Sequence, residues 1–338
     1  MKETKRLYDV ELIRSLAIIF VVTYHCFAPY FIFPVFNVPI NDSLRFIFLE
    51  LSSFRMPLFV FLSGYLFSYL YIMKNKYQDS QDFVIKKFKR LIIPYVIFYI
   101  LFHFTANSIG NHKPEGHLWF IRMLFMEFIF IRCIIIPILQ KTKKNYIYLF
   151  LLIFFFIIKY SIYHHECYGF VQQFIQYLPY FYLGYLTIYF LTKQSQFPTN
   201  KIGILIASIA IICCNIILYY DTIDDRFSSK LSVLVFKDLL SISTIYWFFS
   251  ITNRYLSFIS KHSNIWGKIN KSSYGIYVFH HWLIFLILGN EMILKHINNF
   301  AQIHYIIFPF ILLITIFIIS YLITQILLKT KVGRFLIG

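Results

Sequence analysis

Ionisable side chains inside long apolar segments are the first feature of this sequence that could do chemistry. A charged side chain in a membrane span costs about 2.5–3.5 kcal/mol on insertion scales and normally faces a protein interior or a wet cavity. Helix packing alone would not require so many of them, so the pattern indicates a buried polar site. The candidates are Arg14, His25, Glu50, Arg55, His103, Arg122, Glu127, Arg132, His280 and His281.

The first apolar segment holds an arginine and a histidine at a spacing that aligns them. Arg14 and His25 are eleven residues apart, about three whole turns of an α-helix, so they share one helix face with an axial gap of roughly 16 Å. Such a pair fits a path for an elongated anionic cofactor whose far end reacts beside the imidazole. Alternatively, Arg14 anchors the helix at the membrane surface and His25 forms a hydrogen bond between helices.

Two further motifs follow in the chain. Ser63-Gly64 lacks bulk, which permits close backbone approach between membrane helices, either for a cofactor or simply for packing. The segment 86–90 then concentrates positive charge that can hold phosphates, bind anionic lipid headgroups or set membrane topology. Its four cations are Lys86, Lys87, Lys89 and Arg90.

Metal and disulfide chemistry are not expected. The segment His164-His165-Glu166-Cys167 resembles a metal cluster, but adjacent histidines point apart on a strand or helix. The cysteines show no CxxC spacing, and most lie in apolar runs where a free thiol is a small hydrophobe. They are Cys26, Cys133, Cys167, Cys213 and Cys214.

The elements that must position these residues are membrane-spanning helices. Of the 338 residues, 59% are hydrophobic and 14% charged, and the mean hydropathy is +0.66. The apolar runs have about the 20 residues that cross a hydrocarbon core. We therefore predict an all-α polytopic membrane protein whose single domain covers residues 1–338 without an appended soluble domain. The expected ten spans are 11–33, 45–73, 91–108, 117–139, 146–163, 172–192, 202–220, 230–250, 272–290 and 303–328.

The distribution of basic residues predicts the orientation. One set of alternate loops, together with both termini, carries 21 Lys and Arg, and the opposite set carries five. Cytoplasmic loops are the basic ones, so both termini are expected in the cytoplasm. The same loops account for most of the net charge of +17. Nucleic acid is therefore not an expected partner, whereas membrane lipids are.

Several motifs together make the chain resemble the membrane-bound acyltransferase-3 family, which modifies bacterial surface polysaccharides, lipid-linked sugars and some antibiotics. The resemblance covers most of the chain, and the motifs occur in family order. One departure is that the basic motif is usually written with arginines, whereas three of its four cations here are lysines, which lack the bidentate fork. The matching residues are Arg14 with His25, Phe59-Val60-Phe61-Leu62-Ser63-Gly64, Lys86-Lys87-Phe88-Lys89-Arg90 with Pro94, His117-Leu118-Trp119-Phe120 and Tyr277-Val278-Phe279-His280.

The resemblance implies acyl-CoA, most simply acetyl-CoA, as a co-substrate on the cytoplasmic side of a bacterial inner membrane. It implies a glycan or lipid-linked saccharide as acceptor at the outer half of the membrane. Arg14 and the cations of segment 86–90 would hold the nucleotide phosphates. The pantetheine arm would pass Ser63 and Gly64 and deliver its thioester to His25.

In this interpretation His25 is the general base that deprotonates an acceptor hydroxyl. The alternative mechanism, which is less favoured, forms a covalent acyl-histidine intermediate. Glu50 or Glu127 would orient the ring. The other candidates for positioning the sugar or the developing oxyanion are Arg55, Trp119, Arg122 and His280. Two alternatives remain open: a transporter or flippase for a lipid-linked glycan or small anion, and a structural subunit of an envelope glycan machine.

Overall fold

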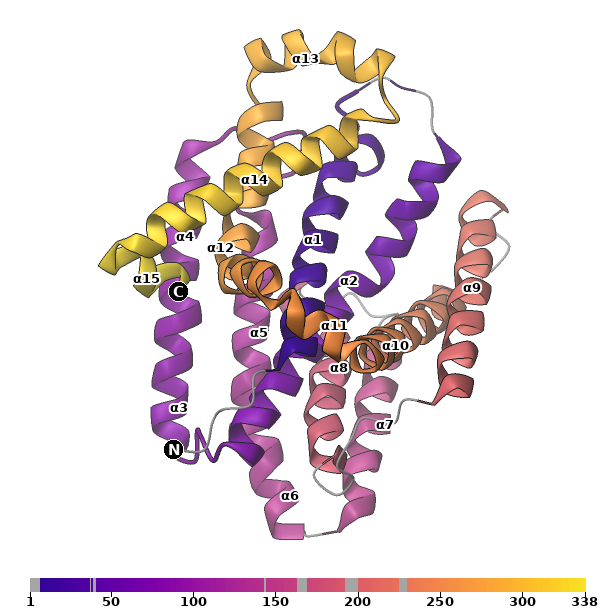
Figure 1. Cartoon of the computed structure of the whole chain (residues 1–338), viewed down its shortest axis with the longest axis vertical. Coiled ribbons are helices and arrows are strands. Elements are labelled where there is room, and N and C mark those ends of the chain that lie inside the picture. The colour runs from indigo at the N-terminus through magenta and orange to yellow at the C-terminus, as the bar shows by residue number, and fades with distance from the viewer. Residues whose placement is uncertain are drawn as a thin grey trace. The chain divides into compact units, whose positions relative to one another are not determined.

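The computed structural model describes residues 7–36, 38, 41–142, 144–162, 169–191, 200–224 and 230–338. Within these residues the regular secondary structure is helical, apart from one isolated bridge between Ile109 and His112 (Figure 1). The predicted all-α class is confirmed. The segment His164-His165-Glu166-Cys167 lies outside the described residues.

The helices follow one another through short connections. Three π-helical turns occur between or after the α-helices. The turn η1 continues α2, η2 joins α3 to α4, and η4 joins α5 to α6. The elements are α1 (Tyr8–Phe31), α2 (Asp42–Ser68), η1 (Tyr69–Met73), α3 (Ser80–Lys87), η2 (Phe88–Ile92), α4 (Ile93–Thr105), η3 (Gly116–Leu118), α5 (Trp119–Phe130), η4 (Ile131–Ile135), α6 (Ile136–Thr142), α7 (Asn145–Ile162), α8 (Gly169–Leu191), α9 (Lys201–Asp224), α10 (Lys230–Arg254), α11 (Leu256–Lys261), α12 (Ser263–Leu288), α13 (Glu291–Ile303), α14 (Phe308–Lys329) and α15 (Lys331–Ile337).

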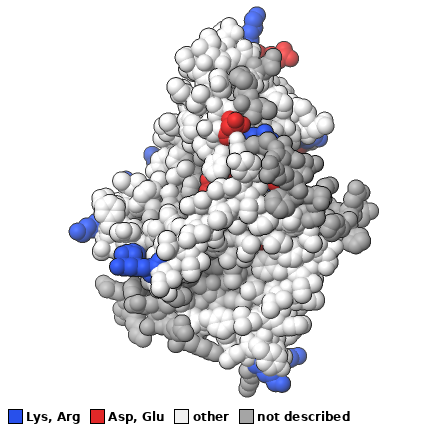
Figure 2. Space-filling model, turned by 90° about the vertical axis from the view of Figure 1, so that its right-hand side faces the viewer, with Lys and Arg blue, Asp and Glu red and all other residues white. Residues whose placement is uncertain are grey.

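The number of candidate spans is smaller than predicted. Among the described residues, eight helices are long and apolar enough to cross a membrane, and α12 with α13, bent by 88°, makes up to nine. The predicted span 172–192 is the helix α8, which is not among them. Its first turns carry Gln172, Gln173 and Gln176, which lower its hydropathy. The face drawn in Figure 2 is largely uncharged among its described residues, as contact with lipid requires.

The chain divides into two compact units. Unit 1 comprises Met1–Arg55, Val96–Leu118 and Trp247–Gly338, and unit 2 comprises Met56–Tyr95 and Trp119–Tyr246. In unit 1, helix α1 packs against α12 and α14. Gly275 permits the α12–α14 approach, because a Cβ there would overlap the side chain of Thr324.

In unit 2, the second half of α2 packs against α8 through two glycines. A Cβ on Gly64 would overlap the carbonyl of Phe181, and a Cβ on Gly184 would overlap the carbonyl of Phe61. The Ser68 hydroxyl donates to the Tyr185 carbonyl at 2.9 Å, one turn further along. The two backbones therefore touch over more than one turn, which is the usual role of small residues between membrane helices.

Unit 2 also contains a buried ion pair. Lys159 Nζ of α7 lies 2.5 Å from Asp238 Oδ1 of α10, and both side chains are buried. The hydroxyls of Tyr180 and Tyr160 donate to the same carboxylate at 2.5 and 2.8 Å. Three helices thus converge on one carboxylate whose hydrogen-bonding capacity is well used.

Removing one partner of this pair is expected to destabilise the protein strongly. Lys159→Met leaves Asp238 charged and buried without its cation, a change that costs about 3–5 kcal/mol in buried pairs. In Lys159→Met/Asp238→Asn the charge is gone and the amide oxygen still accepts from the tyrosines, so most of the loss is recovered. Thermal unfolding in detergent measures both variants. A single variant as stable as the wild type would contradict the expectation.

Candidate active site

Four imidazole rings gather in unit 1 around His25. Helix α1 supplies His25, η3 supplies His117, and α12 supplies His280 and His281. The ring centroid of His25 lies 5.1 Å from that of His280 and 4.8 Å from that of His281. The ring of His117 lies 5.3 and 4.6 Å from the same two. Residues more than 250 positions apart in sequence thus form one cluster.

Backbone carbonyls hold three of these rings in place. His117 Nδ1 and His281 Nδ1 both lie against the Pro114 carbonyl, at 3.1 and 3.0 Å. His280 Nδ1 lies 3.0 Å from the Ile276 carbonyl, one turn back on α12. A carbonyl only accepts, so each of these ring nitrogens carries the hydrogen. In His280 and His281 the lone pair of a neutral ring is then on Nε2.

His117 connects two segments. Its Nε2 lies 3.1 Å from the Val278 carbonyl on α12, and the Tyr277 hydroxyl donates to the backbone carbonyl of His117. Both of its ring nitrogens face carbonyl oxygens, so the ring positions η3 against α12.

His25 is the exception in the cluster. Its side chain is only partly buried, and neither ring nitrogen hydrogen-bonds to any residue that the structure describes. In particular, Glu50, which belongs to the same unit as His25, does not orient the ring through a direct hydrogen bond. The imidazole of His25 is thus the one in the cluster with both ring nitrogens open, among the described residues, to exchange a proton with a substrate.

A guanidinium lies beside this imidazole. Arg55 Cζ of α2 stands 3.2 Å above the ring centroid of Tyr24, and Arg55 Nη1 donates to the Leu51 carbonyl at 3.2 Å. The Tyr24 ring contacts the ring of His25 edge-on, with centroids 5.3 Å apart. A positive charge held next to the proton acceptor can stabilise negative charge that develops on a substrate oxygen.

The predicted alignment of Arg14 and His25 on α1 holds in part. Both residues lie on this one helix, and the two side chains between them on the shared face, Ile18 and Val21, are 0% and 1% exposed. The shared face therefore points into unit 1, and Arg14 is itself partly buried at its N-terminal end.

The predicted phosphate-binding cations and Ser63-Gly64 lie in unit 2. Lys86 forms an exposed ion pair with Asp82 at 2.6 Å. Lys87 Nζ stands 3.4 Å from the ring centroid of Phe128. Lys89 and Arg90 are exposed.

Ser63 and Gly64 take part in helix packing. The Ser63 hydroxyl donates to the Phe59 carbonyl of its own helix at 3.0 Å. Gly64 lies against Phe181 of α8. This contact gives Gly64 a structural reason to be glycine that is independent of any cofactor.

Three further candidates of unit 2 lie on α5. Trp119 stacks on Tyr177 at a centroid distance of 5.7 Å, and Arg122 Cζ lies 4.5 Å from the ring centroid of Phe170. Glu127 is fully buried, and its two carboxylate oxygens have no hydrogen-bond partner among the described residues.

Sequence reasoning missed two residues of the loop before η3. Glu115 is buried and its Oε1 lies 2.8 Å from His103 Nδ1. Its neighbour Pro114 supplies the carbonyl that holds two imidazoles. A backbone carbonyl has no sequence signal. The motif around His117 was a usable clue that this loop belongs to the site.

No group of three or more His, Cys, Asp or Glu is arranged to hold a metal ion in the part of the chain that the structure describes. In the histidine cluster, the Nδ1–H groups of His117, His280 and His281 are turned toward backbone carbonyls.

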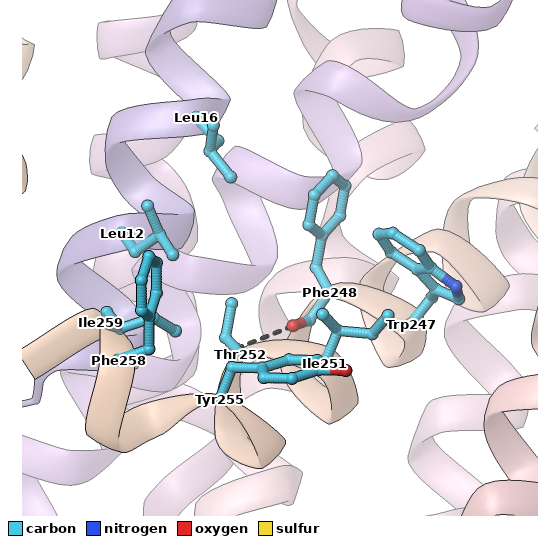
Figure 3. Close-up of a pocket in the computed structure, with 9 residues that line it drawn as sticks. All are labelled: Leu12, Leu16, Trp247, Phe248, Ile251, Thr252, Tyr255, Phe258 and Ile259. Atoms are coloured by element: carbon cyan, nitrogen blue, oxygen red, sulfur yellow. Dashed lines mark hydrogen bonds between the residues drawn. The ribbon is translucent and has the colours of Figure 1, made fainter.

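An apolar groove of about 540 Å³ lies elsewhere in unit 1 (Figure 3). Side chains of α1, α10 and α11 line it, among them Leu12, Leu16 and Phe248. Thr252 turns its hydroxyl to the Phe248 carbonyl at 2.7 Å, which leaves its methyl group to the groove. The groove contains none of the predicted site residues.

Comparison with known proteins gives the family to which the chain belongs. No curated protein and no solved structure matches the chain. A family model described as an acyltransferase domain matches residues 7–325, which include the histidine cluster and the basic segment 86–90. The transporter alternative has no such support. The chain is therefore a membrane acyltransferase that belongs to the acyltransferase-3 family.

Proposed function

We propose that this enzyme transfers an acyl group, most simply acetyl, from cytoplasmic acyl-CoA to a hydroxyl of a cell-surface glycan or lipid-linked saccharide. The enzyme would lie in the inner membrane of a bacterium with both termini in the cytoplasm. The observation that carries the proposal is the state of His25: a partly exposed imidazole, unengaged by described protein groups, beside an arginine and three fixed rings.

The transfer step uses His25 as general base. A ring nitrogen of His25 accepts the proton of the acceptor hydroxyl while the hydroxyl oxygen attacks the thioester carbonyl carbon. Arg55 stabilises the oxyanion that forms. The carbon–sulfur bond then breaks, the electron pair stays on sulfur, and the imidazolium returns the proton to give the free thiol of CoA. The ring of His280 contacts the ring of His25. It would hold that ring in place and help to position the acceptor.

Donor binding is assigned to Arg14 and to Lys86, Lys87, Lys89 and Arg90, which would hold the phosphates of CoA. The exposure of Lys89 and Arg90 supports their part in this, because exposed side chains are accessible to a soluble donor. Ser63 and Gly64 would line the path of the pantetheine arm. Glu50 and Glu127 remain the candidate carboxylates for tuning the imidazole, and Trp119 and Arg122 the candidates for holding the sugar.

The purified protein in lipid nanodiscs is expected to move label from acetyl-CoA carrying a labelled acetyl group onto surface polysaccharide extracted from a deletion strain. In Lys89→Ala/Arg90→Ala the KM for acetyl-CoA is expected to rise about tenfold or more, because each charge-assisted contact is worth about 1.5–3 kcal/mol. The kcat should change little. Scintillation counting of the isolated polysaccharide measures both.

The matched control is Lys141→Ala/Lys144→Ala, which removes one exposed cation from the last turn of α6 and one from the connection that follows it. Its KM should stay within about twofold of the wild type. Equal KM values in the two double variants would remove segment 86–90 from the donor site. A protein that moves saccharide across the bilayer but transfers no label would be a flippase.

A further inference from the structure

The N-terminal half of α8 carries a stripe of amide and phenol side chains that the acyl-transfer step does not use. Gln172, Gln173, Gln176 and Tyr177 occupy two pairs of positions four residues apart, which places them on one side of the helix. All four are partly buried. In a chain this apolar, such a stripe needs an explanation.

The glutamines are not engaged within the protein. The amides of Gln172 and Gln176 form no hydrogen bond with any described residue, and the buried Oε1 of Gln173 has no partner. An unpaired buried amide costs about 1–3 kcal/mol. The cost is recovered when a ligand supplies the missing donors and acceptors.

The surroundings of the stripe add aromatic and charged groups. Trp119 lies nearly parallel to Tyr177, with an interplanar angle of 27°. Arg122, three residues after Trp119 and so on the same side of α5, lies over Phe170 at the start of α8. Its buried Nε has no hydrogen-bond partner in the part of the chain that the structure describes.

A narrow cleft continues the stripe toward the buried ion pair. Gln172 and Gln176 line it together with Lys159, Ile162, Ile175 and Leu234. Its volume of about 20 Å³ is enough for roughly one water molecule. A ligand therefore lies along the stripe at the mouth of the cleft and not inside it.

The chemistry of the stripe favours a neutral polyhydroxylated ligand over an anion. The charge of Lys159 is balanced by Asp238 at 2.5 Å. Amides offer both donors and acceptors, which matches hydroxyl groups that are also both. A flat indole offers a surface for the apolar face of a sugar ring, and its N–H remains available for a hydroxyl.

We infer that this stripe (Gln172, Gln173, Gln176 and Tyr177, with Trp119 and Arg122) is a subsite for a sugar unit of the saccharide acceptor. The inference rests on the proposed function for the identity of the acceptor. It also agrees with the predicted topology, in which α5 and α8 begin, and α7 ends, on the outer side of the membrane.

The test uses the full-length protein in nanodiscs with unacylated surface polysaccharide from the deletion strain. In Gln172→Ala/Gln176→Ala the KM for polysaccharide rises at least about tenfold, while the KM for acetyl-CoA, measured through its hydrolysis, stays within about twofold. Trp119→Ala behaves in the same way, and Trp119→Phe, which keeps a flat ring, recovers part of the loss. Unchanged KM values for polysaccharide in the stripe variants would overturn the subsite.

The matched control is Gln302→Ala on α13 of unit 1, whose amide bonds to Asn298 at 3.3 Å. It should leave both KM values unchanged. If the double glutamine variant does not fold, as judged by its melting temperature, Gln172→Ala and Gln176→Ala carry the same test singly.

Polysaccharide binding to His25→Ala, measured by calorimetry, separates this inference from the proposed function. Binding that is lost only when the glutamines are also replaced supports the subsite, even if the wild type transfers no acyl group. If the wild type transfers acyl groups, and His25→Ala binds polysaccharide equally well with and without the glutamine substitutions, the proposed function is supported and the subsite is removed.

Discussion

His25→Ala is expected to lower the rate of acyl transfer by about a hundredfold to ten-thousandfold, the usual contribution of a general base. The ring is the one in its cluster whose nitrogens no described protein group engages. Its removal takes away the proton acceptor without breaking a hydrogen bond on which the fold depends. Transfer of labelled acetyl groups to polysaccharide, by enzyme of verified folding and donor affinity, measures the loss.

His262→Ala is the matched control, because His262 is an exposed histidine of unit 1 at the end of α11. It should transfer at the wild-type rate. A folded His25→Ala enzyme that binds acetyl-CoA and transfers at the normal rate would remove His25 from the mechanism. Intact-protein mass spectrometry after incubation with donor alone distinguishes the two roles of His25: a base leaves the protein mass unchanged, and an acyl-histidine adds the mass of the acyl group.

Gly64→Ala is expected to destabilise the protein by about 1–3 kcal/mol or more, as overpacking does. A Cβ at this position overlaps the Phe181 carbonyl, which belongs to helix backbone and cannot rotate away. Helices α2 and α8 must therefore separate along their contact. Thermal unfolding in detergent, together with the yield of monodisperse protein, measures the effect.

The control for this substitution lies in the partner helix. Gly169→Ala in α8 adds the same methyl group where no other described part of the chain, apart from the adjacent residues and the helix's own backbone, lies within 4 Å, and it should be neutral. A Gly64→Ala protein that melts like the wild type but has a raised KM for acetyl-CoA would show that the glycine serves the donor and not the helix contact.

The fold class and the first helix could be predicted because both depend on patterns of residues that are close together in the sequence. Apolar runs of membrane length give the helices, and the spacing of Arg14 and His25 gives their shared face. The helix α8 was predicted as a helix of the right extent. Its glutamines, however, place it outside the candidate spans of the described chain.

The parts that could not be predicted depend on contacts between distant segments. Sequence reasoning listed His281 as a candidate and His117 as part of a motif but gave a role only to His280, although the three rings belong to one cluster. Lys159 and Asp238 are 79 residues apart, and nothing near either residue indicates its partner. The rings of His280 and His281 lie against the ring of His25, a contact that no local pattern in the sequence indicates.

The carbonyl of Pro114 accepts from both His117 and His281, and this sharing makes the two rings mechanically dependent on each other. A shift of this one oxygen changes the geometry of both hydrogen bonds at once. Since the two rings lie on different helical segments, the short connection ahead of η3 acts as a common pivot for them. A displacement of that connection would therefore move the rings of His117 and His281 together.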